Sequence, residues 1–101
     1  MYLIQILLPL RDNQGQPYLA DMFQSVNASL VEAFGGVTAY SRVPAKGTWV
    51  HHDHEERDDV IVLEVMAETL DRAWWEKFRL GLESQMRQKE IVVRSHPIDR
   101  L

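Results

Sequence analysis

Residues 2–10 read Tyr2-Leu3-Ile4-Gln5-Ile6-Leu7-Leu8-Pro9-Leu10, and residues 60–66 read Val60-Ile61-Val62-Leu63-Glu64-Val65-Met66. Because successive side chains of a β-strand point to opposite faces, each segment carries two rows of side chains. One row of each segment is wholly apolar: Ile4, Ile6 and Leu8 in the first, and Ile61, Leu63 and Val65 in the second. The opposite rows are apolar except for Gln5 and Glu64 at their centres. A strand with one face in water alternates between apolar and polar residues, so both strands are predicted to be covered on both faces.

Two helices are expected between and beyond these strands. Apolar residues recur at intervals of three and four in the first: Leu19, Met22, Phe23, Val26, Leu30, Ala33 and Phe34. Pro17 suits its first turn, and Gly35 and Gly36 end it, because glycine adopts the left-handed cap conformation without steric cost. In the second helix Thr69 is the expected N-cap, with Asp71 in the first turn. Its apolar stripe is Trp74, Trp75, Phe78, Leu82 and Met86, with Gly81 beside the stripe, where it would allow close approach to the sheet, and Leu80 pointing away.

Two more polar strands complete the pattern. One is predicted over residues 37–43, broken at 44–47 and resumed at 48–50; the other covers residues 90–97. Residues 51–59 are interpreted as a charged hairpin loop. The resulting order, β-α-β-β-α-β, is that of the ferredoxin-like fold, in which the first and third strands are central. We therefore expect an α+β protein in which residues 1–101 form a single domain, with a four-stranded antiparallel sheet and two helices on one face.

Composition excludes several classes of function. The chain has 101 residues, a formal net charge of −4 and no cysteine. The absence of cysteine excludes disulfides and thiolate catalysis, and interspersed charges give no footprint for nucleic acid. The apolar start is too short to span a bilayer and lacks the basic region of a signal peptide. We expect a cytoplasmic protein that needs no cofactor and binds neither nucleic acid nor membrane.

The arrangement resembles the dimeric α/β-barrel superfamily, in which two ferredoxin-like protomers pack open sheet face to open sheet face and enclose a cavity. Three short segments also look like an uncharacterised family of short bacterial proteins: Phe34-Gly35-Gly36-Val37-Thr38, Gly47-Thr48-Trp49 and Gln88-Lys89-Glu90-Ile91-Val92-Val93. The superfamily implies a homodimer through the open face, and includes cofactor-independent monooxygenases and haem-dependent enzymes. The bacterial family implies a fold and no known activity.

The candidate site follows from the open face. Its polar members also include Thr38 and Arg42, and those expected to line a cavity between protomers are Gln5, Tyr40, Glu64, Arg94 and His96. Gln5 and Glu64 are expected to be cross-strand neighbours, with Arg94 or His96 reaching in from the edge. A carboxylate there could act as a general acid or base. The alternative interpretation, which we prefer, is that Glu64 and Arg94 form an interface salt bridge and Gln5 bonds to a partner.

Two other clusters have competing interpretations. His52 and His54 point the same way in an extended segment and could chelate a metal with a carboxylate. A site needs supporting partners as well as ligands, so this segment is interpreted as a solvated loop and no metal is predicted. Trp74 and Trp75 could stack on a flat ligand, but residues at helical spacing more often form core, with Trp75 towards its edge.

Two functions of different classes remain open. In the first, the chain is a dimeric module of unknown biochemical role whose open face serves mainly as an interface. In the second, it is a cofactor-independent enzyme, monooxygenase-like or isomerase-like, acting on a small apolar oxygenated molecule in the barrel cavity. An interface filled by paired side chains favours the first, and an empty pocket of several hundred Å³ with Glu64 or His96 at its wall favours the second.

Overall fold

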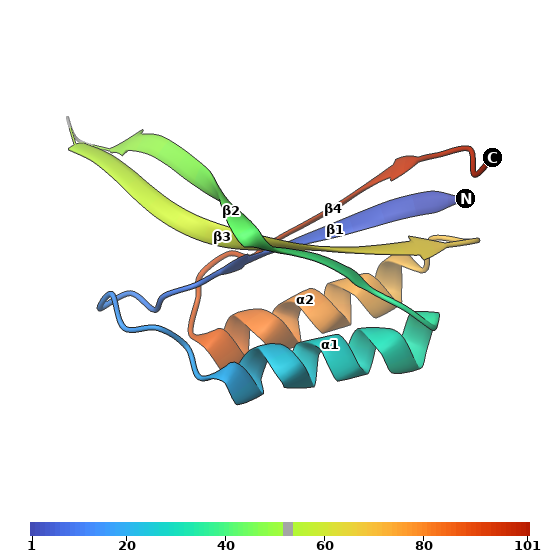
Figure 1. The fold of residues 1–101 in the computed structure, drawn as a ribbon, viewed down its shortest axis with the longest axis horizontal. Coiled ribbons are helices and arrows are strands. Elements are labelled where there is room, and N and C mark those ends of the chain that lie inside the picture. Colours follow the sequence, from blue (N-terminus) through green and yellow to red (C-terminus); the bar gives the residue numbers. More distant parts are fainter. Residues whose placement is uncertain (52–53) are drawn as a thin grey trace.

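The computed structural model describes the backbone of residues 1–51 and 54–101 and the side chains of residues 1–39 and 60–101. The elements are β1 (Tyr2–Pro9), α1 (Ala20–Phe34), β2 (Thr38–His51), β3 (His54–Ala67), α2 (Arg72–Met86) and β4 (Val92–Pro97). The strands form one antiparallel sheet of order β2-β3-β1-β4. Both helices cover the same face of it (Figure 1). The predicted α+β ferredoxin-like fold is therefore confirmed, with β1 and β3 at the centre.

The core lies between the helices and the predicted inner rows. Ile4, Ile6 and Leu8 of β1 are at most 1% exposed, and Leu63 and Val65 of β3 at most 3%. From the helical layer they are met by Val26, Leu30, Trp75, Leu82 and Met86. The register sets Ile6 opposite Leu63 and Ile4 opposite Val65, so apolar side chains line up across the sheet. The prediction of which face the helices cover is confirmed.

The helix ends show which sequence signals act. Gly35 caps α1 with φ +80°, as predicted. The N-cap of α2 is Asp71, whose carboxylate accepts a hydrogen bond from the Trp74 N–H at 3.1 Å. The prediction that Thr69 caps this helix is wrong, because Asp71 lies one residue before the first helical turn and an aspartate bonds the third residue on. Helix α1 begins at Ala20 rather than at Pro17.

Aromatic side chains fill the space between the helices near one end of the sheet. Phe34 stacks on Trp75 with ring centroids 5.0 Å apart, and Trp74 stacks on Phe78 at 5.1 Å. Trp75 is 6% exposed and Trp74 is partly exposed, the reverse of the expected order. Gly81 does not touch the sheet, since a Cβ built on it would meet nothing within 4 Å. The close approach predicted there is wrong, whereas Leu80 points outward as predicted.

The hairpin between β2 and β3 departs most from the prediction. Residues 46–51 pair with residues 54–59 in continuous register, from Lys46 opposite Asp59 to His51 opposite His54. The charged loop predicted over residues 51–59 is therefore wrong for the described part of that segment, which is strand. A register shift between Tyr40 and Ala45 spans Pro44, which has no N–H to contribute to the ladder. We call residues 46–51 and 54–59 the arm.

The arm extends past the rest of the sheet. β1 ends its pairing with β3 at Pro9 opposite Val60, so the arm has no third strand beside it. Its six paired positions correspond to about 20 Å of strand. It rises on the side of the sheet away from the helices (Figure 1). The radius of gyration, 14.2 Å, accordingly exceeds the ~13 Å of a compact chain of this length.

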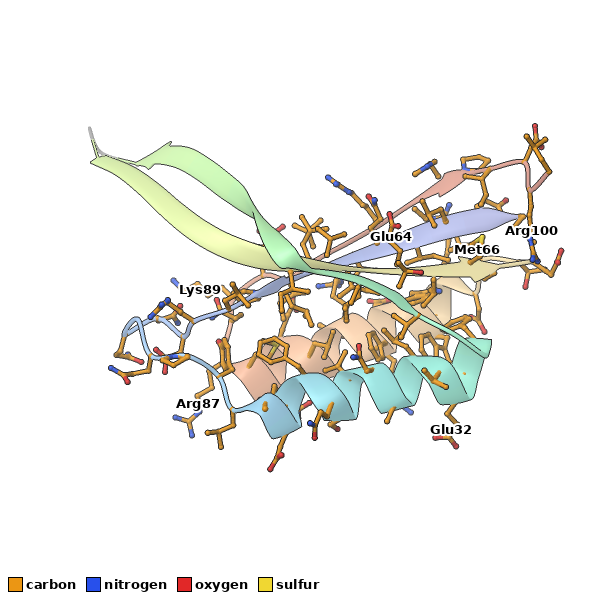
Figure 2. All side chains as sticks on the ribbon, in the orientation of Figure 1. Glu32, Glu64, Met66, Arg87, Lys89 and Arg100 are labelled. Carbon is orange, nitrogen blue, oxygen red and sulfur yellow. The ribbon has the colours of Figure 1, made fainter. Side chains whose placement is uncertain are left out.

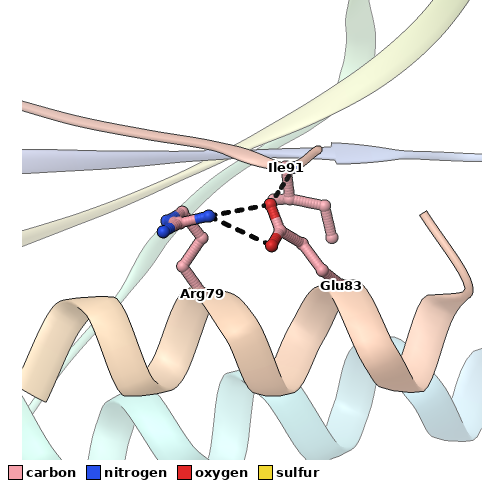
Figure 3. Close-up of polar contacts among 3 residues, drawn as sticks. All are labelled: Arg79, Glu83 and Ile91. Atoms are coloured by element: carbon pink, nitrogen blue, oxygen red, sulfur yellow. Dashed lines mark hydrogen bonds and ion pairs between the residues drawn. The ribbon is translucent and has the colours of Figure 1, made fainter. Parts of the chain in front are cut away.

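A carboxylate joins α2 to the start of the last strand. Arg79 Nη1 donates to Glu83 Oε1 and Oε2 at 3.0 and 3.1 Å, and the Ile91 N–H donates to Oε2 at 2.8 Å (Figure 3). The hydrogen bond from the Ile91 backbone, helped by Arg79, lowers the pKa of Glu83, although partial desolvation opposes the change. Glu83 therefore holds the strand entry at Ile91, which is 2% exposed, against the helix.

Removing core side chains should destabilise the fold. Ile6→Ala or Leu63→Ala should each lower the free energy of unfolding by about 2–5 kcal/mol, because each leaves a cavity in a fully packed layer. Phe78→Ala should lower it by about 3–5 kcal/mol. Leu80→Ala, at a 51% exposed position of the same helix, is the control and should change it by less than about 0.5 kcal/mol. Urea denaturation measures all four, and equal losses for Ile6 and Leu80 would contradict the assignment of faces.

The Glu83 contacts make stability depend on pH. Because the folded state lowers the pKa of Glu83, the unfolded chain takes up this proton first as the pH falls. The stabilisation is therefore present above the unfolded value of ~4.3 and is lost on acidification through the lower folded value. Glu83→Gln should reduce stability at pH 7 and flatten its decline below about pH 5. Glu76→Gln, at an exposed position of α2, should leave stability at pH 7 nearly unchanged; identical pH profiles for wild type and Glu83→Gln would contradict the assignment.

Candidate functional site

A row of polar side chains crosses the sheet face that the helices leave open. Glu64 of β3 and Arg94 of β4 are both register partners of Gln5 on β1. Gln5 Nε2 donates to Glu64 Oε2 at 2.6 Å, and Arg94 Nε donates to Gln5 Oε1 at 2.8 Å. The amide of Gln5 thus accepts from a cation on one side and donates to an anion on the other. We call Glu64, Gln5 and Arg94 the polar row.

Apolar side chains lie on both sides of the polar row. Leu7, Val62 and Val92 form one flanking row across the three strands, and Leu3 and Met66 form the other, with the polar His96 at its β4 end. Met66 is 49% exposed and Val92 42% exposed. Figure 2 shows Glu64 and Met66 on the side of the sheet away from the helices. In the described part of the chain no element lies over this face (Figure 1).

The structure places the predicted site residues unequally. Gln5, Glu64 and Arg94 meet as expected for cross-strand neighbours, although Gln5 stands between the two charges rather than beside a direct ion pair. His96 is exposed and is the register partner of Leu3. Tyr40 is the register partner of Val62, and its side chain lies outside the described residues. That these five residues line a cavity stays a prediction.

The side chains of the histidine cluster lie outside the described residues, so the prediction that it holds no metal stays a prediction. His52 lies outside the described residues, and His54 is the first residue of β3, opposite His51. Across the described part of the chain, no three His, Cys, Asp or Glu side chains gather closely enough to hold a metal ion. Nor does any described helix have the length and apolar character needed to cross a membrane.

A cleft at one end of the sheet was not anticipated from the sequence. It has a volume of about 980 Å³ and lies where the end of α1, the start of α2 and the end of β3 meet. Aromatic and apolar groups from Phe34, Trp74 and Met66 share its wall with Glu64, Asp71 and Arg100. Glu64 therefore belongs both to the polar row and to this cleft. Two sequence features lie at its wall: the Gly35-Gly36 pair, which ends α1, and the pair Trp74 and Trp75, which was considered as a stacking surface for a flat ligand.

The cleft combines an aromatic wall with a few charged groups, as small-molecule sites do. Two of its three carboxylates are held by hydrogen bonds: Asp71 caps α2, and Glu64 accepts a bond from Gln5. Both are oriented by the fold, so the site can present acceptors in fixed positions. The arrangement can bind a flat or apolar molecule that carries hydrogen-bond donors.

Comparison with known proteins identifies the fold alone. No protein-family model and no curated protein matches the chain. Among solved structures, the chain is similar to the divalent cation tolerance protein Cut A1 from Thermus thermophilus, with 13% identity and a TM-score of 0.62 over 99% of this chain and 86% of that one. It is also similar to a phage SAM lyase, in complex with S-methyl-5'-thioadenosine (11% identity, TM-score 0.58, 94% and 79% covered) and in the apo state (12%, 0.59, 94% and 78%).

These structures share the ferredoxin-like fold, and identities this low carry no activity across. The resemblance of the three short segments to a family of short bacterial proteins stays a prediction, because no family model matches.

Proposed function

We propose that the chain is a self-associating module whose open sheet face is a homodimer interface. The observation that carries the proposal is the uncovered apolar surface around the polar row, where Met66 and Val92 are 49% and 42% exposed. Burial of apolar surface contributes about 25 cal/mol per Å², so a partner that covers these rows gains stability. Contiguous apolar surface rimmed by polar groups is typical of interaction sites.

The arm supports the same proposal. A two-stranded ribbon with no third strand is at best marginally stable in water, and the arm extends about 20 Å beyond β1. Because it rises on the side of the open face (Figure 1), it can contact a second subunit placed there. Two-fold dimers are the commonest homo-oligomers, and the resemblance to dimeric α/β barrels favours the same state.

Substitution on the open face should dissociate the dimer. Wild type should have about twice the 11.8 kDa mass of the chain at micromolar concentration. Leu7→Asp places a charge within the interface, where it would be buried without a partner, so this variant should be monomeric. Leu80→Asp, on the outer surface of α2, is the matched control and should remain dimeric.

Light scattering measures the masses, and circular dichroism checks that each variant is folded. A monomeric wild type would refute the proposal.

A second candidate function, favoured by the cleft, is binding of a small molecule. The notion of a cofactor-independent enzyme requires such a site, and about 980 Å³ is enough for a drug-sized ligand. The SAM lyase solved in complex with S-methyl-5'-thioadenosine has a similar fold, which makes that nucleoside a reasonable first probe. The aromatic edge of Trp74 and the carboxylates of Glu64 and Asp71 would recognise its base and hydroxyl groups.

Titration with S-methyl-5'-thioadenosine, followed by amide and indole NMR signals, tests this candidate. Binding should shift the amide signals of Gly35 and Gly36, which line the cleft but not the hollow between the helices, together with the indole signal of Trp74, which lines both. The signals of Ser25 and Ser29, in the separate hollow between the helices, should stay in place. Shifts confined to Ser25 and Ser29, or none at millimolar probe, would contradict a nucleoside site in the cleft.

A further inference from the structure

We infer that two copies of this chain pack open face to open face about a two-fold axis that runs along β1, so that Glu64 of each copy faces Arg94 of the other. The inference rests on the self-association proposed above and adds the direction in which the second copy sits. Its basis is the order of charges along the polar row.

That order is anion, neutral amide, cation. Glu64 and Arg94 pair in register with Gln5 from opposite sides. Neighbouring strands are about 4.8 Å apart, so each charge lies roughly 5 Å from Gln5 and Gln5 marks the middle of the row. The hydrogen bonds through the Gln5 amide hold both charged side chains over the open face. Each copy therefore carries a negative charge at the β3 end of the polar row and a positive charge at the β4 end.

The direction of a two-fold axis between the faces decides which charges meet. An axis along the strands reverses the direction of the partner's polar row. Glu64 of each copy then faces the partner's Arg94, so the pair occurs twice. An axis across the strands sets each charge against its own counterpart, which is unfavourable. A diagonal axis, which gives orthogonal sheets, sets each charge over the positions of Leu3 or Leu7. Only the first gives both charges of the polar row an opposite charge.

The twist of the sheets is compatible with this placement of Glu64 opposite the partner's Arg94. Packed sheets that are aligned differ in strand direction by about 30°. At roughly 5 Å from the axis this rotation moves a charge by about 2.6 Å, which Arg and Glu side chains span easily. The apolar rows agree, since Val62 then faces the partner's Val92, and Leu3 and Leu7 lie on the axis and face themselves.

Arg94 and Glu64 can form hydrogen bonds between subunits in addition to those they make with Gln5. Arg94 uses Nε to reach Gln5, and a guanidinium binds a carboxylate through its terminal amino groups as well. A carboxylate has about four lone-pair sites, so Glu64, which accepts from the Gln5 amide, can also accept from a guanidinium of the partner. The polar row would thus continue from one subunit into the next.

Charge exchange tests the pairing. Glu64→Arg gives two cationic ends and Arg94→Glu gives two anionic ends, so each variant alone should self-associate at least about tenfold more weakly than wild type. An equimolar mixture should associate as tightly as wild type, because both cross-subunit pairs are restored. Sedimentation velocity measures the three dissociation constants. With an axis across the strands, like charges face each other in wild type and in each single variant. Dissociation constants of the single variants equal to that of wild type would therefore overturn the inference.

Cross-linking tests the axis itself, and the chain has no cysteine of its own. With the axis along β1, Leu3→Cys should be joined to itself by a short bismaleimide, because the two backbones lie about 10 Å apart. With the axis across the strands these positions are about 17 Å apart. Leu3→Cys would then cross-link only in a mixture with Leu7→Cys. Self-linking of Leu3→Cys supports the inference, and linking only in that mixture overturns it.

Different results would contradict the proposed self-association and the proposed direction of the axis. A dimeric wild type whose Leu3→Cys variant does not link to itself overturns the axis and leaves self-association standing. A monomeric wild type overturns both.

Discussion

The rest of the structure depends on the register between β1 and β3. It sets Ile6 against Leu63 on the helical side and, one residue away, Gln5 against Glu64 on the other. A slip of one strand by one residue would turn all of its side chains to the opposite face and so bury either Gln5 or Glu64 under the helices without water. The apolar inner rows therefore fix the core, and the same pairing brings the polar row together. Stability and the candidate interface are two consequences of one alignment.

Much of this alignment could be predicted from the sequence, because the central strands carry a strong signal. Ile4, Ile6 and Leu8 alternate with a row broken only by Gln5, and the prediction of central strands, covered faces and cross-strand neighbours followed. The arm gave no such signal. Its strands leave the core, so alternation is not imposed on them, and the charges of residues 51–59 favoured a loop. The two strands of the arm are paired through their backbones, and amino-acid composition does not predict such pairing.

Local errors have a similar cause. Thr69 and Asp71 are both good caps, and the choice between them depends on where the chain leaves β3, which tertiary structure decides. Gly81 was assigned to the sheet because it lies beside the apolar stripe, but it faces the hollow between the helices. The cleft was not predicted because its wall is formed by segments that are distant in sequence, which include Phe34, Met66 and Arg100. Only their arrangement in space forms the cleft.

Glu64 links the two proposed functions. It closes one end of the polar row and also lines the cleft, so a partner that engages Glu64 would act on the cleft wall. If the second subunit supplies Arg94 at this position, dimerisation would set the charge that a ligand meets. The polar row would then serve the interface and the cleft together, since the same carboxylate is oriented by Gln5 for both. Ligand binding and self-association would be thermodynamically coupled through this residue, each changing the affinity of the other by the same factor.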